Sequence, residues 1–376
     1  MQRPWSQKQD PVKEDKLAVY EPSCYLCPSN TRKSGAINPK YDKTFFFKND
    51  FASLNNNVSE TLKSNNELFS ETSERGVCEV ICYTPQHDTN FSKLTISEIE
   101  EIIKIWKERY IALSSLDYIN HVQIFETRGK EVGNSTIHPH CQIWAQESIP
   151  SLPAKIIRNQ EEYFKKHKQK MLLEYIKKEV KDKERIICSI GNFTLLVPFW
   201  AEWPYETYIM PTIDLSSMAE LSEKDISDLS KMLFVTAKMY SLFFERPLNG
   251  APYMMSISQK PTLEYENDSM QLFFKYITPL LTPTRQKYQA GYEKSAESQR
   301  DLTPELAAKQ LREVVEENKD RFVGINVHVK EETAQSNSRS FFDYSSSEKI
   351  KLMRAAGREA QKEQNLLLKA YEAKFG

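Results

Sequence analysis

The segment STIHPHCQIW, residues 135–144, contains two of the chain's six histidines, two positions apart. Apolar and polar residues alternate after the second histidine, a pattern typical of a strand. Residues i and i+2 of a strand point to the same face, so His138, His140 and Gln142 are predicted to form a row. Such a row offers an imidazole nucleophile or metal ligand, a second imidazole beside it, and an amide that can hydrogen-bond an oxyanion. The alternative is a surface strand that happens to carry two histidines.

A single CxxC pair, Cys24 and Cys27, lies in the turn CYLCPSN. It is typical of half a tetrahedral zinc site, but it can equally be a redox pair or two buried thiols. His87, together with His138 or His140, can supply the two further ligands of a Cys₂His₂ site. Spacing alone leaves these interpretations open.

Composition excludes several classes of protein. The chain has 376 residues and a net charge of −1, so neither nucleic acid nor an anionic membrane is an expected partner. We find no apolar run long enough to cross a membrane and no secretory signal, and we therefore expect a cytoplasmic location. The six cysteines are too scattered for a disulfide framework. No glycine-rich phosphate loop occurs, so phosphate chemistry would have to use side chains.

The periodicity predicts strands and capped helices in two similar arrangements. Thr95 with Glu98, and Ser222 with Asp225, form capping boxes before amphipathic helices. Each box follows a strand-ending proline by ten or eleven residues, which indicates an internal duplication of an antiparallel α+β unit. The predicted strands are 77–83, 122–127, 141–146, 193–197 and 207–210.

Three further segments complete this interpretation. Residues 152–183 are highly charged and are predicted to be helical, and Thr303 with Pro304 begins a helix that reaches about residue 317. Ser345 begins a long helix that runs almost to the last residue, and 55–73 is predicted to be a surface loop.

Six motifs occur in an order that resembles one known family: CYLCPSN, NPKYDKTFFFKNDFASL, RGVCEVICYTPQH, HPHCQIWAQ, FWAEWPYET and GYEKSAESQRDLT. Over roughly residues 3–318 the chain is similar to the galactose-1-phosphate uridylyltransferases of the histidine-triad superfamily. The resemblance implies an α+β fold of two histidine-triad-like halves, with a mainly antiparallel sheet flanked by helices. The expected domains are a catalytic half with a zinc site at 1–190, a degenerate half at 191–320, and a helical extension of unassigned role at 321–376.

The resemblance also implies a two-step transfer in galactose catabolism. His140 matches the nucleophile that takes a uridylyl group from UDP-glucose and passes it to galactose 1-phosphate. Gln142 matches the glutamine that hydrogen-bonds the phosphoryl oxygens, and Ser135 matches a serine that contacts the phosphates. A neutral imidazole is a competent nucleophile near pH 7, which agrees with this role.

Other residues take expected roles from the same resemblance. Zinc is the implied cofactor, with a structural role, and its ligands would be Cys24, Cys27, His87 and His138. Asn49 and Asp50 match residues on the uridine side. Sugar and phosphate contacts made across a homodimer interface are matched by Lys287, Tyr292, Glu293 and Gln299.

The chain departs from the family pattern at three places, and two rival interpretations stay open. Arg3 is expected to bind substrate, but an arginine expected upstream of it is absent. Thr127 stands where asparagine is usual, and Asn134 stands where cysteine or a small residue is common. One rival keeps the His140 chemistry but acts on ADP-glucose, as related adenylyltransferases and phosphorylases do. The other is a non-catalytic relative that binds UDP-sugars.

Overall fold

A computed structural model describes residues 14–57, 68–69, 71–262, 269–289, 291–322 and 324–329. All of these residues belong to one compact unit, Met1–Lys330. The predicted helix from Ser345 onward lies outside the described residues. No helix within the described ranges is both long and apolar enough to cross a membrane.

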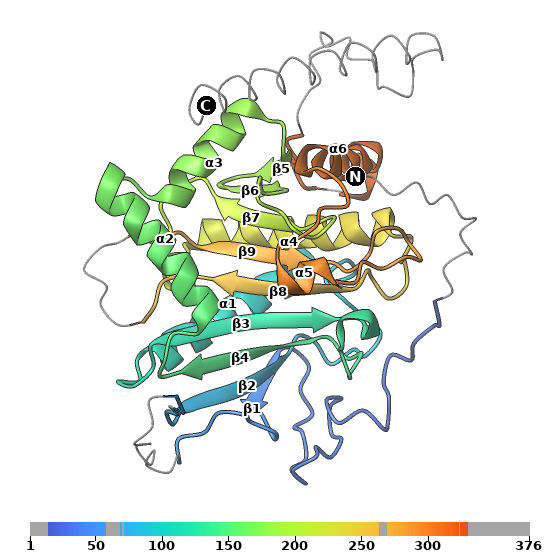
Figure 1. Cartoon of the computed structure of the whole chain (residues 1–376). Helices are drawn as coiled ribbons and strands as arrows, with labels where there is room; N and C mark the ends of the chain where they lie inside the picture. Colours follow the sequence, from blue (N-terminus) through green and yellow to red (C-terminus); the bar gives the residue numbers. More distant parts are fainter. Residues whose placement is uncertain are drawn as a thin grey trace, which may run out of the picture. The chain divides into compact units, whose positions relative to one another are not determined.

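The described strands form one open antiparallel sheet, in the order β1-β2-β4-β3-β8-β9-β7-β6-β5 (Figure 1). Every predicted strand is present with its ends within one residue of the expected ones. The sheet, in spatial order, is β1 (Phe45–Lys48), β2 (Gly76–Cys82), β4 (His140–Gln146), β3 (His121–Arg128), β8 (Tyr253–Ser258), β9 (Phe273–Ile277), β7 (Thr207–Pro211), β6 (Phe193–Leu196) and β5 (Ile186–Ile190).

The sheet is built from the same unit twice. In the first half β2 is followed by helix α1 (Ile96–Ser114), β3 and β4, and in the second β7 is followed by helix α4 (Glu223–Phe243), β8 and β9. The order β1-β2-β4-β3 is repeated in reverse as β8-β9-β7-β6, so the halves join where β3 pairs with β8. The predicted duplication and the α+β class are therefore confirmed. The predicted boundary at residue 190 stays a prediction, because one sheet runs through both halves.

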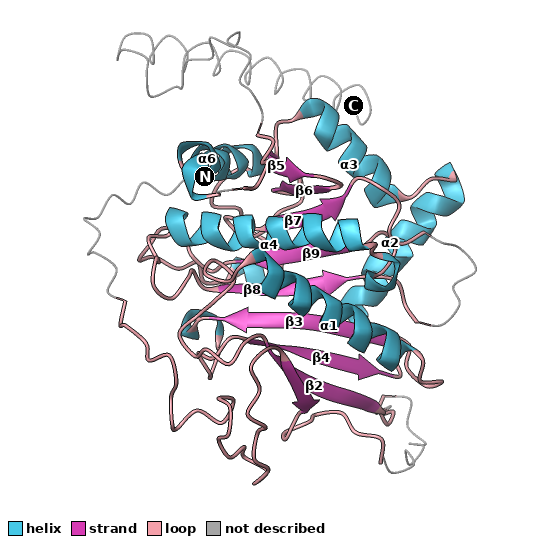
Figure 2. Cartoon of the chain, turned by 180° about the vertical axis from the view of Figure 1, so that it is seen from behind, coloured by secondary structure: helices cyan, strands magenta, loops and turns pink. Residues whose placement is uncertain are grey.

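Helices α1 and α4 cover the same face of the sheet, and both lie in front of it in Figure 2. Both predicted capping boxes are present, with the Thr95 and Ser222 side chains accepting the backbone N–H three residues on. The predicted apolar stripe of α1 is buried against the sheet, and its members are Ile99, Ile102, Ile103, Trp106, Tyr110 and Leu113. Helix α6 (Pro304–Glu317) begins at the predicted Thr303 cap and adds Leu311 and Val315 to the same core.

The charged segment 152–183 is two helices, not one. Helix α2 (Ser151–His167) ends at Lys168, whose backbone is left-handed at φ 56°, and helix α3 (Met171–Asp182) follows. No glycine or proline marks this break, so the sequence carried no local signal for it. A short helix, α5 (Tyr292–Ser295), was also not predicted.

Helix α3 covers the opposite face of the sheet, and it covers only the second half. Phe274 of β9 belongs to the core under α4, whereas its neighbour Phe273 packs with Leu172 and Ile176 of α3. Because successive strand residues point to opposite faces, α3 and α4 lie on opposite sides. In the first half, Cys141 of β4 joins the α1 core. His140 and Gln142 alternate with Cys141 and must therefore face the other side of the sheet, opposite α1.

Glu126 of β3, which is 3% exposed, links β8 in the core to Tyr83, the residue that directly follows β2. The hydroxyl of Tyr83 donates to Glu126 Oε2 at 3.1 Å, and that of Tyr253 donates to Oε1 at 3.2 Å. Burial raises the pKa of Glu126 to about 7, because a desolvated carboxylate is costly. Between about pH 4.5 and pH 7 the folded chain therefore keeps a proton on Glu126 that the unfolded chain has already released.

We expect Glu126→Gln to be more stable than the wild type at pH 8, by about 1–3 kcal/mol. The raised pKa makes the wild type lose stability as pH rises through that window, and glutamine removes this loss. Urea-denaturation midpoints at pH 5 and pH 8 measure it, with the exposed Glu317→Gln as the control. A wild type whose stability rises between these pH values relative to Glu126→Gln would contradict the assignment.

Candidate functional site

Four predicted ligands from three separate segments converge on one buried point. The metal-ligating atoms of Cys24, Cys27, His87 and His138 all lie within 4.8 Å of one another. The cysteines come from a turn that precedes β1, His87 from the loop after β2, and His138 from the approach to β4.

The chemistry of this cluster fits a metal ion. Cys27 Sγ lies 3.6 Å from His87 Nδ1 and 3.5 Å from His138 Nδ1. Tetrahedral ligands bound at 2.0–2.3 Å lie about 3.3–3.8 Å apart, so these separations suit one shared ion. His138 Nε2 bonds to the Thr84 carbonyl oxygen at 2.9 Å, which requires the proton on Nε2 and leaves the Nδ1 lone pair for the metal.

Burial favours the neutral form of both the imidazole and the thiol ligands. It lowers the pKa of His138 to about 3, so this imidazole is neutral and able to ligate. It raises the pKa of Cys27 to about 12, so a free thiolate there would be unfavourable. A bound cation reverses that preference by stabilising the thiolate. The cluster can therefore hold a four-coordinate metal ion.

The two histidines of HPH lie in two different sites. The prediction that His138 belongs to the same row as His140 is wrong. The strand begins at His140, so His138 and Pro139 precede it and do not follow its alternation. The His138 ring enters the Cys₂His₂ cluster, whereas His140 lines the pocket on the side of the sheet opposite α1. Gln142 does continue the row from His140, because both belong to β4.

A single hydrogen bond fixes the tautomer of His140. Its Nδ1 lies 2.8 Å from the carbonyl oxygen of His138, which can only accept, so Nδ1 carries the proton. Burial lowers the pKa of His140, so the ring is neutral near pH 7. A neutral imidazole protonated at Nδ1 keeps its lone pair at Nε2, which is the form that a nucleophile needs.

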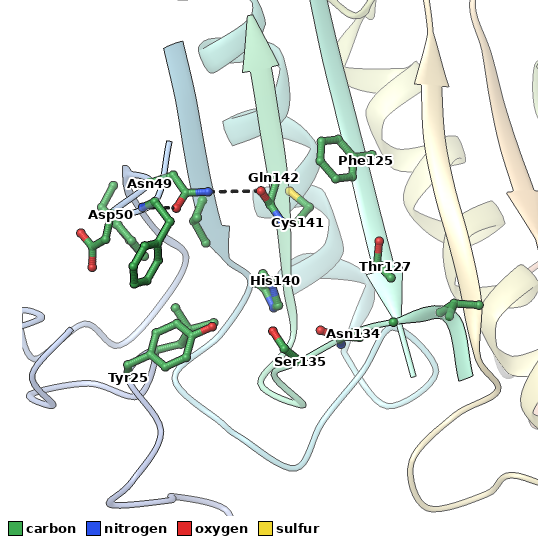
Figure 3. A pocket seen from close by; sticks show the side chains of 16 residues that line it. Tyr25, Asn49, Asp50, Phe125, Thr127, Asn134, Ser135, His140, Cys141 and Gln142 are labelled. Carbon is green, nitrogen blue, oxygen red and sulfur yellow. Dashed lines mark hydrogen bonds between the residues drawn. The ribbon is translucent and has the colours of Figure 1, made fainter. Parts of the chain in front are cut away.

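The pocket around His140 is lined by residues from four segments (Figure 3). Among the described residues that line it there is no lysine or arginine, so anionic oxygen atoms would have to be met by neutral donors. The lining consists of Tyr25, Leu26, Phe47, Asn49, Asp50, Phe51, Val80, Phe125, Thr127, Val132, Gly133, Asn134, Ser135, His140, Cys141 and Gln142.

The loop that carries Ser135 is held by local contacts. Gly129 has φ 93°, and a Cβ there would lie 2.6 Å from Cβ of Pro252, so only glycine fits. Asn134 Oδ1 accepts the backbone N–H of Thr136 at 3.1 Å, so this departure from the family pattern organises the loop. Ser135 and Thr127 both line the pocket, and the phosphate contact expected of Ser135 stays a prediction.

The pair Asn49 and Asp50 lies at the end of β1, across the pocket from the loop. Arg32 Nη1 lies 3.6 Å from Asp50 Oδ1, and the Arg32 guanidinium stacks 4.2 Å over the ring of Phe47. Asn49 Nδ2 donates to Gln142 Oε1 at 3.2 Å, so this side chain also contacts the predicted oxyanion donor.

The other predicted substrate contacts do not line this pocket. Lys287 is buried and its Nζ lies 3.1 Å from Glu293 and 3.0 Å from Asp301, with a further bond to the Gln299 carbonyl oxygen. Tyr292 is exposed on α5. Their role across a dimer interface stays a prediction, and Arg3 lies outside the described residues.

Sequence reasoning missed two residues of the site. Trp144 Nε1 donates to Gln142 Oε1 at 3.0 Å, and the period of β4 places it on the same face, so its position could have been inferred. Arg32 gave no such signal, because its contact with Asp50 depends on how the turn after Cys27 folds back.

Two family models match almost the whole described region. Residues 1–150 match the N-terminal domain of galactose-1-phosphate uridyl transferase, and residues 156–322 match its C-terminal domain. A galactose-1-phosphate uridylyltransferase of Haemophilus influenzae is 40% identical over 332 residues, covering 88% of this chain and 91% of the relative. That of Rattus norvegicus is 35% identical, covering 83% of this chain and 82% of its own.

Solved structures share the fold. A uridylyltransferase superposes with a TM-score of 0.71 at 24% identity, covering 84% of this chain and 98% of its own. An ADP-glucose phosphorylase from Arabidopsis thaliana, with bound ADP-glucose, superposes with a TM-score of 0.63 at 23% identity, covering 77% and 90%.

We expect the purified protein to carry one metal ion per chain, and Cys27→Ala to lose it. Removing one of four ligands from a closed site weakens metal binding strongly, and metal affinity contributes directly to folding. Elemental analysis by mass spectrometry measures the metal content, and thermal unfolding should also begin at a lower temperature.

Cys188→Ala is the matched control, because Cys188 is a buried thiol of β5 outside the cluster. It should keep the metal. A wild type without metal, or a Cys27→Ala variant that retains it fully, would refute the metal site.

Proposed function

The chain belongs to the galactose-1-phosphate uridylyltransferase family, and on that premise we propose that it transfers a uridylyl group from UDP-glucose to galactose 1-phosphate through His140. The observation that carries the proposal is the hydrogen bond from His140 Nδ1 to the His138 carbonyl oxygen. It leaves Nε2 as the nucleophilic nitrogen in a pocket that also contains Gln142 and Ser135.

The transfer takes place in two balanced steps. The Nε2 lone pair attacks the α-phosphorus of UDP-glucose, a nitrogen–phosphorus bond forms, and the bond to the leaving oxygen breaks with release of glucose 1-phosphate. A phosphate oxygen of galactose 1-phosphate then attacks the same phosphorus and returns the electron pair to Nε2. Both leaving groups are stable without added protons, so neither step needs a general acid. The His138 carbonyl oxygen stabilises the positive charge that develops on the ring.

Neutral hydrogen-bond donors stabilise the negative charge on the reacting phosphate. Gln142 Oε1 already accepts two hydrogen bonds, so its NH₂ group is the part available to the phosphoryl oxygens. Ser135 is the second proposed donor, and Asn49 with Asp50 would bind the uridine side. A correctly oriented donor contributes about 10²–10³ in rate in comparable oxyanion sites.

We assign the metal as zinc with a structural role, held by Cys24, Cys27, His87 and His138. Two thiolates and two imidazoles are ligands typical of structural zinc, which would supply cross-linking and no reaction chemistry. By holding the His138 ring, the cluster would also hold the carbonyl oxygen that orients His140.

The proposal extends to the whole assembly. The catalytic half is 1–190 and the degenerate half is 191–320, with the enzyme acting in the cytoplasm as a homodimer. Arg3 would contact substrate, and each subunit would complete its partner's pocket with Lys287, Tyr292, Glu293 and Gln299. The absence of lysine and arginine among the described pocket residues supports a contribution from another segment or subunit.

Brief mixing with UDP-glucose and no acceptor should increase the intact mass by one uridylyl group. The gain should be absent in His140→Ala and should disappear when galactose 1-phosphate is added. ADP-glucose is tested as the competing donor. A mass gain of one adenylyl group with ADP-glucose, and no gain with UDP-glucose, would favour the phosphorylase-like alternative. No gain with either nucleotide, although UDP-glucose binds, would contradict transfer and favour a non-catalytic relative.

The homodimer is tested by sedimentation equilibrium at micromolar concentration. Two chains of 43.8 kDa should sediment as one particle of twice that mass. Mixing His140→Ala with Lys287→Ala should restore activity, because mixed dimers contain one pocket with neither change. A monomer, or no recovery from mixtures that exchange subunits, would refute the shared pocket.

A further inference from the structure

We propose that Trp144 is a positioning residue that, together with Asn49, fixes the rotation of the Gln142 amide so that its NH₂ group faces the reacting phosphate. The inference rests on the proposed function, since it concerns how the oxyanion donor of that reaction is oriented. It adds a residue that is not among those lining the pocket.

Two donors converge on one oxygen. Trp144 Nε1 donates to Gln142 Oε1 at 3.0 Å, and Asn49 Nδ2 donates to the same atom at 3.2 Å (Figure 3 shows the second bond). An amide oxygen has two lone pairs, so both are used. The NH₂ group of Gln142 is therefore on the other side of the amide.

The orientation follows from groups that can only donate. An indole N–H has no acceptor capacity, so the atom that Trp144 meets must be an oxygen. At the other end, the backbone N–H of Phe51 donates to Asn49 Oδ1 at 2.9 Å, which fixes the Asn49 amide and presents its NH₂ group to Gln142. A rotated Gln142 amide would set its NH₂ group against two N–H donors and lose both bonds.

The indole itself is held in place by its surroundings. Trp144 and Gln142 lie on the same face of β4, two residues apart. The ring of Phe125 on β3 meets the Trp144 ring edge-to-face, with centroids 5.8 Å apart and planes at 76°. Phe125 is the cross-strand partner of Gln142, so one aromatic pair packs directly beside the amide. Rotation of the indole would break this contact.

The cost of a wrong orientation is high in this pocket. A rotated amide would point an oxygen lone pair at an anionic phosphate and replace an attraction with a repulsion. No lysine or arginine among the described lining residues could compensate. Loss of the Trp144 N–H should therefore lower the rate of the chemical step more than it lowers the affinity for substrate.

Trp144→Phe tests this with the ring retained and the N–H removed. We expect the rate of uridylyl transfer to His140 at saturating UDP-glucose to fall about tenfold, because one of two orienting bonds is lost. The half-saturating UDP-glucose concentration should change less than about threefold. Rapid-quench intact mass measures both, and thermal unfolding reports folding. Trp144→Tyr is the second variant if Trp144→Phe does not fold.

Trp200→Phe is the matched control. It removes an indole donor to the Tyr208 hydroxyl, 3.4 Å away in the second half of the chain, and should leave the rate unchanged. Equal losses in both variants would indicate a general effect of removing tryptophan and would overturn the proposal.

A double-mutant cycle separates positioning from packing. If Trp144 acts through Gln142, adding Trp144→Phe to Gln142→Ala should lower the rate less than twofold further. The same tenfold loss in that background, or a single variant as fast as the wild type, would overturn the inference alone. A wild type that forms no covalent adduct would overturn the proposed function, and this inference with it.

Discussion

The site depends on the backbone carbonyl oxygen of His138. This atom accepts a hydrogen bond from Nδ1–H of His140. The side chain of His138 itself belongs to the buried Cys₂His₂ cluster. One residue therefore connects this cluster to the orientation of the neighbouring ring. Because Pro139 stands between the two histidines, the backbone that joins them has little freedom. A shift of the His138 backbone would displace both the ring in the cluster and the carbonyl that fixes the His140 tautomer.

The duplicated fold explains why only one half presents this chemistry. Both halves contain the same β-α-β-β unit, but α3 packs on the second half over the face that corresponds to the pocket. There β9 presents Phe273, stacked on Tyr208 at 5.0 Å, and Lys275, whose Nζ lies 3.0 Å from Glu206. An apolar contact and an ion pair thus occupy the face that carries His140 and Gln142 in the first half.

Local patterns predicted five of the nine described strands and missed β1, β5, β8 and β9. The two capping boxes and the five strands were found because they depend on neighbouring residues and simple periods. The break at Lys168 was missed, since a left-handed lysine has no sequence signature. His138 was assigned to the strand face because alternation was extended one step past the start of β4.

The site was harder to predict from residue types alone. His140 and Gln142 follow from the period of one strand, whereas the four ligands come from three segments and were assigned through resemblance. The contact of Asn49 with Gln142 spans β1, β2 and β4, so it depends on the register of two strand pairs. Long-range register cannot be read from local patterns.

The most direct test of the central claim is a crystal structure of the adduct trapped with UDP-glucose in the absence of acceptor. The account predicts phosphorus bonded to Nε2 of His140, with Nδ1 still bound to the His138 carbonyl oxygen and the Gln142 NH₂ group donating to a phosphoryl oxygen. Phosphorus on Nδ1, or on another residue, would contradict it.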